Sequence, residues 1–306
     1  MKRTRVVLAS VATVAALALT ACGGDGGDPL GGGNSSPAAS DTIAVGSANF
    51  PESALLAQIY AGALTAKGVK VTTKLNIGSR EKHIPGLQDG SIDLIPEYSG
   101  VLLQYFDKNA TQVSSDEVYA ALKTKLPANL TVLNQSTAED KDSVTVTRET
   151  ADKYNLKSIA DLQPVAGQLT LGGPPEWKTR QTGAPGLKKI YNVVFKDFKT
   201  LDAGGPLTIK ALKNGSIQAG DVFTTDPNIV ANGWVALEDP KNLFAAQNVL
   251  PLINKAKASQ QVTDALNAVS AKLTTQVLLD LDKQVITDKK DPAAVAKDFL
   301  STNGLG

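Results

Sequence analysis

Two stretches of the chain alternate short apolar strands with helices, and this alternation constrains the fold more than any other feature. In the first stretch the apolar spacing predicts strands at 43–46, 69–77 and 92–95, separated by helices at 51–64 and 80–88. Strand–helix–strand units of this length favour right-handed crossovers and a largely parallel sheet. A second series of the same kind begins near residue 143, with strands predicted at 143–147, 169–171, 195–201 and 220–223 and helices at 154–162, 187–191 and 208–212.

The two series contain a similar short motif at the same place. Residues 87–93 read LQDGSID and residues 212–218 read LKNGSIQ, so each has a helix end, a glycine, Ser-Ile and a following strand. A chain of 306 residues also exceeds what one hydrophobic core usually serves. We therefore expect two similar α/β lobes.

The C-terminal region returns to helix. Val262, Leu266, Val269 and Leu273 form an apolar stripe, and Asp291 with Pro292 marks the start of a last helix. These helices are expected to pack on the first lobe, so the chain would cross between the lobes twice. The candidate crossing strands are 143–147 and 249–253, which gives lobe 1 as 42–145 plus 249–306 and lobe 2 as 146–248.

The N-terminus has the features of an export signal. A basic start at Lys2, Arg3 and Arg5 precedes an apolar run of about 14 residues, which is too short to span a membrane comfortably. The run ends Leu-Thr-Ala-Cys, which resembles the bacterial lipobox and implies cleavage after residue 21 and a lipid on Cys22. An ordinary signal peptide with an incidental cysteine is the alternative. We expect a signal peptide at 1–21 and a flexible Gly-rich tether at 22–41.

Charge and cysteine content exclude several classes of function. Removal of residues 1–21 takes away three basic groups and no acidic ones, which changes the formal net charge from +1 to −2. Such a chain suits neither nucleic acid nor an anionic membrane surface, so membrane attachment would come from lipid alone. One cysteine and one histidine cannot form an internal disulfide or the usual zinc site. No metal or cofactor is expected.

The predicted sheets place a set of loops where ligands usually bind, beyond the carboxyl ends of parallel strands. These loops are 47–53, 78–80, 97–100, 172–180 and 223–226. They contain much of the aromatic inventory, namely Phe50, Tyr98, Trp177 and Phe223. An aromatic face attracts a cation by about 0.5–2 kcal/mol, but it suits a planar ring or a sugar equally well.

Catalysis has little support in the sequence. His83 lies in a predicted helix with no nucleophile at a recognisable spacing, so a solvated surface position is expected. Glu52, Glu97 and Asp226 could form an acid/base pair, although helix-capping or hinge-locking roles are favoured. Arg180 could hold a carboxylate or form a salt bridge between the lobes, and neither is preferred. We expect a protein that is not an enzyme.

Several motifs resemble those of the osmoprotectant-binding proteins of bacterial ABC importers, which bind glycine betaine, carnitine and choline. The matching segments are 46–52, 87–92, 95–100, 154–162, 185–187 and 221–226. The resemblance implies a two-lobed type II periplasmic-binding fold that closes on a small solute. It also implies delivery of the solute to an ABC permease and its ATPase, by a monomer held outside the cytoplasm through lipidated Cys22.

The loops and the resemblance together define a candidate solute site. Its residues are Asn49, Phe50, Ser53, Gly78, Ser79, Tyr98, Ser143, Trp177, Arg180, Phe223, Thr225, Asp226, Gln247 and Asn248. The family encloses a quaternary ammonium group in tyrosines, and Tyr98 and Phe223 match two walls of that box. Ser143 and the pair Gln247–Asn248 instead fall where the family usually has aromatics. The loss of two walls would remove about 1–4 kcal/mol of cation–π attraction.

The solute therefore has more than one interpretation at this point. A quaternary-ammonium osmoprotectant is the leading hypothesis. Polar side chains at residues 143, 247 and 248 would also suit a polar, polyhydroxylated or aromatic solute. An envelope lipoprotein that keeps the fold but acts outside transport is the further alternative.

Overall fold

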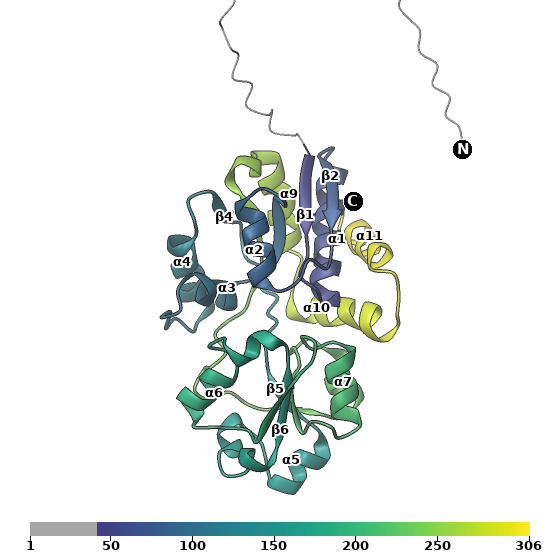
Figure 1. Cartoon of the computed structure of the whole chain (residues 1–306). Coiled ribbons are helices and arrows are strands. Elements are labelled where there is room, and N and C mark those ends of the chain that lie inside the picture. The colour runs from purple at the N-terminus through teal and green to yellow at the C-terminus, as the bar shows by residue number, and fades with distance from the viewer. Residues whose placement is uncertain (1–41) are drawn as a thin grey trace, which may run out of the picture. The chain divides into compact units, whose positions relative to one another are not determined.

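The computed structural model describes residues 42–306, and the expected signal peptide, Cys22 and tether lie outside the described residues. The described part contains two five-stranded sheets, each in its own lobe. In Figure 1 the purple and yellow segments, from the two ends of the described chain, lie together in the lobe of β1. The lobe of β5 and β6 is teal and green, so it comes from the middle of the chain.

The first sheet has the strand order β2-β1-β3-β10-β4. Its strands are β1 (Thr42–Gly46), β2 (Lys70–Lys74), β3 (Leu94–Tyr98), β4 (Leu130–Val132) and β10 (Val249–Asn254). β1 pairs in parallel with β2 and β3, whereas β10 pairs antiparallel with β3 and β4. One half of the sheet is therefore the predicted parallel unit, and a strand from the C-terminal region extends it.

The second sheet repeats this plan with the order β7-β6-β8-β5-β9. Its strands are β5 (Val144–Val146), β6 (Thr170–Gly173), β7 (Asp197–Thr200), β8 (Ala219–Asp221) and β9 (Val235–Ala236). β6 pairs in parallel with β7 and β8, and β5 pairs antiparallel with β8 and β9. Both sheets are mixed, and the prediction of a two-lobed α/β fold is confirmed.

The crossings between the lobes differ from the expected ones. β5 lies wholly in the second sheet and β10 wholly in the first, so neither strand spans both lobes. The chain crosses just before each of them, where Glu139 and Asn248 form an isolated antiparallel bridge. The β-branched run 143–147 and the apolar run 249–253 are rich in such residues because β5 and β10 are buried inside the two sheets. The crossing segments lie just before these runs and have a different composition.

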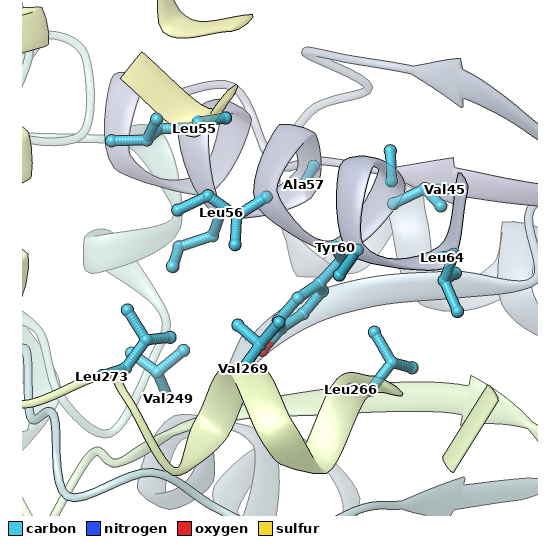
Figure 2. Packing of buried hydrophobic residues seen from close by; sticks show 14 of the residues in the cluster. Val45, Leu55, Leu56, Ala57, Tyr60, Leu64, Val249, Leu266, Val269 and Leu273 are labelled. Atoms are coloured by element: carbon cyan, nitrogen blue, oxygen red, sulfur yellow. The ribbon is translucent and has the colours of Figure 1, made fainter. Parts of the chain in front are cut away.

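Helices cover both faces of the first sheet. They are α1 (Pro51–Ala66), α2 (Arg80–Gln88), α3 (Ser99–Phe106), α4 (Ser115–Lys125), α9 (Gln260–Ser270), α10 (Thr275–Asp282) and α11 (Pro292–Thr302), with a π-helical turn at Lys283–Thr287 after α10. As predicted, Pro292 occupies the first turn of α11 and Asp291 caps it by accepting a bond from the Ala294 amide. Figure 2 shows Tyr60 of α1 reaching toward Val269 of α9 in the core of this lobe.

The second lobe is covered by shorter helices. They are α5 (Arg148–Tyr154), α6 (Ala184–Tyr191), α7 (Pro206–Lys213), α8 (Pro227–Ala231) and 3-10 turns at Ile159–Leu162, Ala166–Gln168 and Pro175–Lys178. The predicted helix 154–162 is wrong, because Asn155 turns left-handed with φ 51° and ends α5. Ser158 then begins a separate 3-10 turn with a capping box to Asp161.

The repeated Gly-Ser-Ile motif has the same packing role in both lobes. A Cβ on Gly46 of β1 would lie 2.7 Å from Ile92 Cδ1, and a Cβ on Gly172 of β6 would lie 2.5 Å from Ile217 Cδ1. Ile92 and Ile217 are the isoleucines of the two copies of the motif. Each isoleucine thus fills the space above a glycine in the first strand of the parallel unit of its own lobe. No helix within residues 42–306 is long and apolar enough to cross a membrane.

Candidate functional site

A cavity of about 160 Å³ lies between the lobes, at the carboxyl ends of β1, β3, β6 and β8. Its wall contains residues of the first lobe, of the crossing segments and of the second lobe. They are Ala48, Asn49, Phe50, Ser79, Arg80, His83, Tyr98 and Val101; Asp140, Asp142 and Gln247; and Pro174, Pro175, Glu176, Arg180, Leu201, Asp202, Ala203, Asp221 and Phe223. This position agrees with the rule that ligands bind beyond the carboxyl ends of parallel strands.

Three aromatic rings from the two lobes meet at the cavity. The Phe50 ring lies 6.0 Å from the Tyr98 ring and 4.9 Å from the Phe223 ring, measured between centroids. The Tyr98 hydroxyl donates to Glu52 Oε1 at 2.5 Å. Burial and then the charge of Glu52 raise the pKa of Tyr98 well above its usual value, so the hydroxyl stays a donor. The result is a fixed aromatic wall whose faces can attract a cation.

Three buried aspartates face the same space. Asp140 and Asp142 stand on the first crossing segment, and Asp221 ends β8. Burial is the largest cause that raises the pKa of each carboxyl, and for Asp221 the charge of Asp142 comes second. Carboxyl groups crowded together in a poorly solvated site resist ionisation unless a cation accompanies them. The cavity therefore has the electrostatic character of a cation site.

The two arginines of the wall are already bonded to glutamates. Arg80 donates from Nε and Nη2 to the two oxygens of Glu97, at 2.9 and 2.6 Å. Burial alone would raise the pKa of Glu97, but the charge of Arg80 and the bond to His83 outweigh it and lower this pKa to about 2. Arg180 donates from Nε and Nη2 to Glu81, at 3.0 and 2.7 Å. Of the two roles expected for Arg180, binding a carboxylate or forming a salt bridge between the lobes, the structure shows the salt bridge.

The surface position expected for His83 is wrong. Its side chain is 2 % exposed, and Nε2 lies 2.6 Å from Glu97 Oε1. The reason is that Glu97, at the end of a fully buried strand, gathers Arg80 and His83 from α2 as its partners. Sequence periodicity in the short, polar α2 does not reveal which of its faces meets that carboxylate.

Asn49, Phe50, Ser79, Tyr98, Arg180, Phe223 and Gln247 line the cavity among the candidate site residues. Others belong to the scaffold around it. The Ser53 hydroxyl accepts a bond from the Ala48 amide, and the Gly78 carbonyl lies 3.3 Å from His83 Nδ1. The Ser143 hydroxyl donates to the Val222 carbonyl at 2.7 Å. Trp177 is fully buried and stacks on Phe244.

The remaining candidates join or cap elements near the cavity. Thr225 donates to Glu52 Oε2 at 2.7 Å and so connects the second lobe to α1 of the first. Asp226 caps α8 by accepting a bond from the Asn228 amide. The Asn248 side chain accepts from the Ser115 hydroxyl and donates to the Ser136 carbonyl. These contacts agree with the capping and hinge-locking roles favoured for Glu52 and Asp226.

The three buried aspartates are among the wall residues that reasoning from the sequence misses. A signal exists for two of them, since Asp140 and Asp142 belong to the short charged run 139–142 directly before the second lobe. Asp221 stands inside a segment that resembles the osmoprotectant binders but is not assigned a role there. A run of charges normally indicates a solvated face. Only the folded crossing segment shows that these charges are buried at a cavity.

A second hollow, of about 690 Å³, lies on the other side of the Phe50–Phe223 contact. Residues from α7, α8 and the turn after α10 line it, together with Glu52 and the buried Asp282. Within residues 42–306 no cluster of three or more His, Cys, Asp or Glu side chains could hold a metal ion.

The fold is thus two mixed α/β lobes that are joined by two crossings and have a cavity between them. Residues 41–302 match the family model described as the substrate binding domain of an ABC-type glycine betaine transport system. The chain belongs to this family, whose members bind transport substrates and are not enzymes.

Known relatives agree with this assignment. The chain is 27% identical over 257 residues to the ergothioneine transport permease/ergothioneine binding protein EgtU of Helicobacter pylori, with 83% of this chain but only 46% of that protein covered. It is 26% identical over 281 residues to the glycine betaine-binding protein YehZ of Escherichia coli, covering 87% of this chain and 92% of that one. The crystal structure of a glycine betaine/carnitine/choline ABC transporter protein superposes with a TM-score of 0.68 at 22% identity, over 86% and 99% of the two chains. The type II periplasmic-binding fold is thereby confirmed.

Proposed function

We propose that the protein binds a small solute with a quaternary ammonium or similar cationic group in the inter-lobe cavity and delivers it to an ABC permease and its ATPase. The observation behind this proposal is the composition of the cavity wall. Three aromatic rings and three buried aspartates face one space, and both arginines of the wall are bonded to glutamates. Aromatic faces and carboxylates both present negative electrostatic potential, so both attract cations.

The names of the relatives support the same class of solute. The H. pylori relative binds ergothioneine and the E. coli relative binds glycine betaine, according to their names. The alternative of a polyhydroxylated or amide-bearing solute relied on the polar side chains at 143, 247 and 248. Of these, Gln247 lines the cavity, whereas the hydroxyl of Ser143 and the amide of Asn248 are bonded to the protein. The cationic solute is therefore the better supported hypothesis.

Membrane attachment is part of the proposal. The lipobox-like segment before Cys22 supports a signal peptide at 1–21 and a diacylglyceryl anchor, with the tether 22–41 between the anchor and a monomeric binding domain outside the cytoplasm. Metabolic labelling with a fatty acid tests the anchor. The wild-type chain should incorporate label and the Cys22→Ser variant should not, and equal labelling of both would contradict it.

Calorimetric titration of the purified protein tests the binding function. Glycine betaine, carnitine, choline and ergothioneine are titrated in turn, with sugars and neutral amides as counter-examples. At least one of these four solutes, each of which has a quaternary ammonium group, should bind and raise the melting temperature. The reason is that a ligand that binds only the folded state stabilises it. The transport role would be abandoned if no small solute bound or shifted the melting temperature.

Truncation of one aromatic wall sharpens the test. Phe223→Ala should weaken binding of the cationic solute by about 2- to 30-fold, the equivalent of one cation–π contact of about 0.5–2 kcal/mol. Tyr154→Ala, which removes a half-buried ring elsewhere in the second lobe, is the matched control and should leave the affinity unchanged. An unchanged dissociation constant for Phe223→Ala would remove that ring from the site.

A further inference from the structure

The charges that face the cavity are unbalanced. Its wall contains Arg80 and Arg180 as cations against five carboxyl groups, those of Asp140, Asp142, Glu176, Asp202 and Asp221. The glutamates that hold the two arginines, Glu97 and Glu81, do not belong to the wall. Both arginines are therefore already paired with glutamates, and the buried aspartates that face the cavity have no cation of their own. Burial raises the pKa of Asp140, Asp142 and Asp221, so a cation that enters the cavity favours their ionised form.

Asp221 gives the clearest evidence that the carboxyl groups of the wall bind a ligand. Its side chain is 0 % exposed, and neither carboxyl oxygen has a hydrogen-bond partner among residues 42–306. The buried Gln247 amide, also on the wall, lies beside Asp142 and lowers the pKa of that carboxyl by hydrogen bonding. A buried polar group without a donor costs about 1–3 kcal/mol, so a carboxyl group in this state at a cavity requires an explanation.

Two of the other carboxyl groups of the wall accept hydrogen bonds from protein donors. Asp202 accepts bonds from the Leu207 and Thr208 amides at the start of α7. Asp140 accepts a bond from the Thr225 amide at 3.2 Å. Asp221 differs from these two in that no donor of the described chain reaches it, and its close neighbour is the carboxyl group of Asp142, whose charge adds to burial in raising the pKa of Asp221.

We propose that the cavity selects solutes with a net positive charge over zwitterionic betaines of the same size. This inference rests on the proposed function, and it specifies which solutes of that class are bound. Cationic and zwitterionic solutes share the trimethylammonium head, which the aromatic wall accepts in both. A betaine also brings a carboxylate into a space where Asp142 and Asp221 already stand and where both arginines are bonded to glutamates. Like charges brought together in a poorly solvated site repel strongly, and the cation without a carboxylate avoids this repulsion.

A pair of ligands with the same shape isolates the charge. Glycine betaine and its carboxamide differ in one group, a carboxylate against a neutral amide, and choline serves as a second cation. Calorimetric titration of the purified wild-type protein should give a dissociation constant for the carboxamide at least about tenfold lower than that for glycine betaine. Choline should follow the carboxamide.

A charge-removing variant identifies the source of the preference. Asp221→Asn keeps the shape of the side chain, so it should weaken binding of the carboxamide and of choline while leaving glycine betaine unchanged or bound more tightly. Asp197→Asn removes the same charge from an exposed position on β7 of the same lobe and should not alter the preference. Asp142→Asn is the second variant, and should also reduce the preference if Asp221→Asn does not fold.

The outcomes separate the inference from the function that underlies it. Glycine betaine bound as tightly as its carboxamide, or more tightly, would overturn the charge selection while the solute-binding role stood. A preference that survives in both aspartate variants would overturn the role of these carboxylates. Failure of all three ligands to bind would overturn the proposed function together with the inference.

Discussion

Asp282, at the end of α10, lies buried beside the glutamate that connects the two lobes. Glu52 accepts bonds from Tyr98 and from Thr225 and is itself buried. Burial, and then the charge of Glu52, raise the pKa of Asp282 well above its usual value. Two carboxyl groups in one dry site cannot both be ionised without cost, so Asp282 is the member that keeps its proton.

This raised pKa gives a stability prediction with a definite sign. A carboxyl whose pKa is raised by folding contributes its stability below the unfolded pKa of about 4 and loses it as the pH rises toward the folded pKa. Asp282→Asn has no proton to lose, so the variant should become more stable than wild type as the pH rises above about 4. Denaturant unfolding of the ligand-free protein between pH 4 and 8 measures the difference.

Asp280→Asn is the control for this experiment. It makes the same change on the same helix at an exposed side chain. Its unfolding free energy should follow that of the wild type across the pH range. A difference between Asp282→Asn and wild type that stayed constant with pH would mean that Asp282 does not keep a raised pKa in the folded protein.

At the scale of elements, the two copies of the Gly-Ser-Ile motif determine how a helix end closes over the first strand of each parallel unit. Gly172 lies under both Ile217 and Leu201, whose Cδ1 atoms would be 2.5 and 2.8 Å from an added Cβ. Core overpacking of this kind costs about 1–3 kcal/mol, so Gly172→Ala should destabilise the protein by about that amount. Chemical denaturation measures the loss.

A second substitution tests whether the loss comes from the contact between residues 172 and 217 or from any added side chain in β6. Ile217→Val removes the nearer methyl group and should recover part of the loss in the double variant, which a double-mutant cycle quantifies. Gly167→Ala is the control, because a Cβ there meets no atom within 4 Å and φ is not in the left-handed region. Additive effects of the two changes would show that Gly172 and Ile217 do not couple.

Local signals in the sequence predict most of the helices and strands. Glycine caps, prolines in first turns and period-two strands are local signals, so the helices at Pro51 and Pro292 and the parallel strands follow from them. The crossings and the cavity do not. Burial of Asp140, Asp142 and His83 depends on contacts between segments far apart in the chain, such as His83 with Glu97, and no local pattern encodes them. Phe50, Tyr98 and Phe223 could be predicted as site residues because each lies at the end of a predicted strand or in the loop that follows it.

At the scale of the whole molecule, a small set of contacts connects the lobes on either side of the cavity. Glu81 pairs with Arg180, and Glu52 accepts from Thr225. Glu81 itself does not line the cavity, although its partner Arg180 does. The side chains of Glu81 and Arg180 are 44% and 25% exposed, which places the pair among partly solvated salt bridges.

Removal of this pair should speed opening of the lobes. Partly exposed ion pairs contribute about 0.2–1 kcal/mol, so Glu81→Gln should raise the solute dissociation rate by about 1.5- to 5-fold. Stopped-flow measurement of solute release gives the rate, and Glu149→Gln, an exposed change on α5, is the control. Since salt screens such pairs, the two proteins should converge at high ionic strength. A release rate equal to that of wild type at low salt would show that the pair does not hold the lobes together.

The cavity wall includes residues of the segments that join the lobes, because Asp140 and Asp142 precede β5 and Gln247 precedes β10. A rotation of one lobe against the other would therefore also move these groups relative to the aromatic rings of the wall. Binding affinity and lobe angle then change together. Under the proposed transport function, a membrane partner that contacts only the outer surfaces of the two lobes would lower the affinity by changing the angle at the crossing segments, and would release the solute without contacting the cavity.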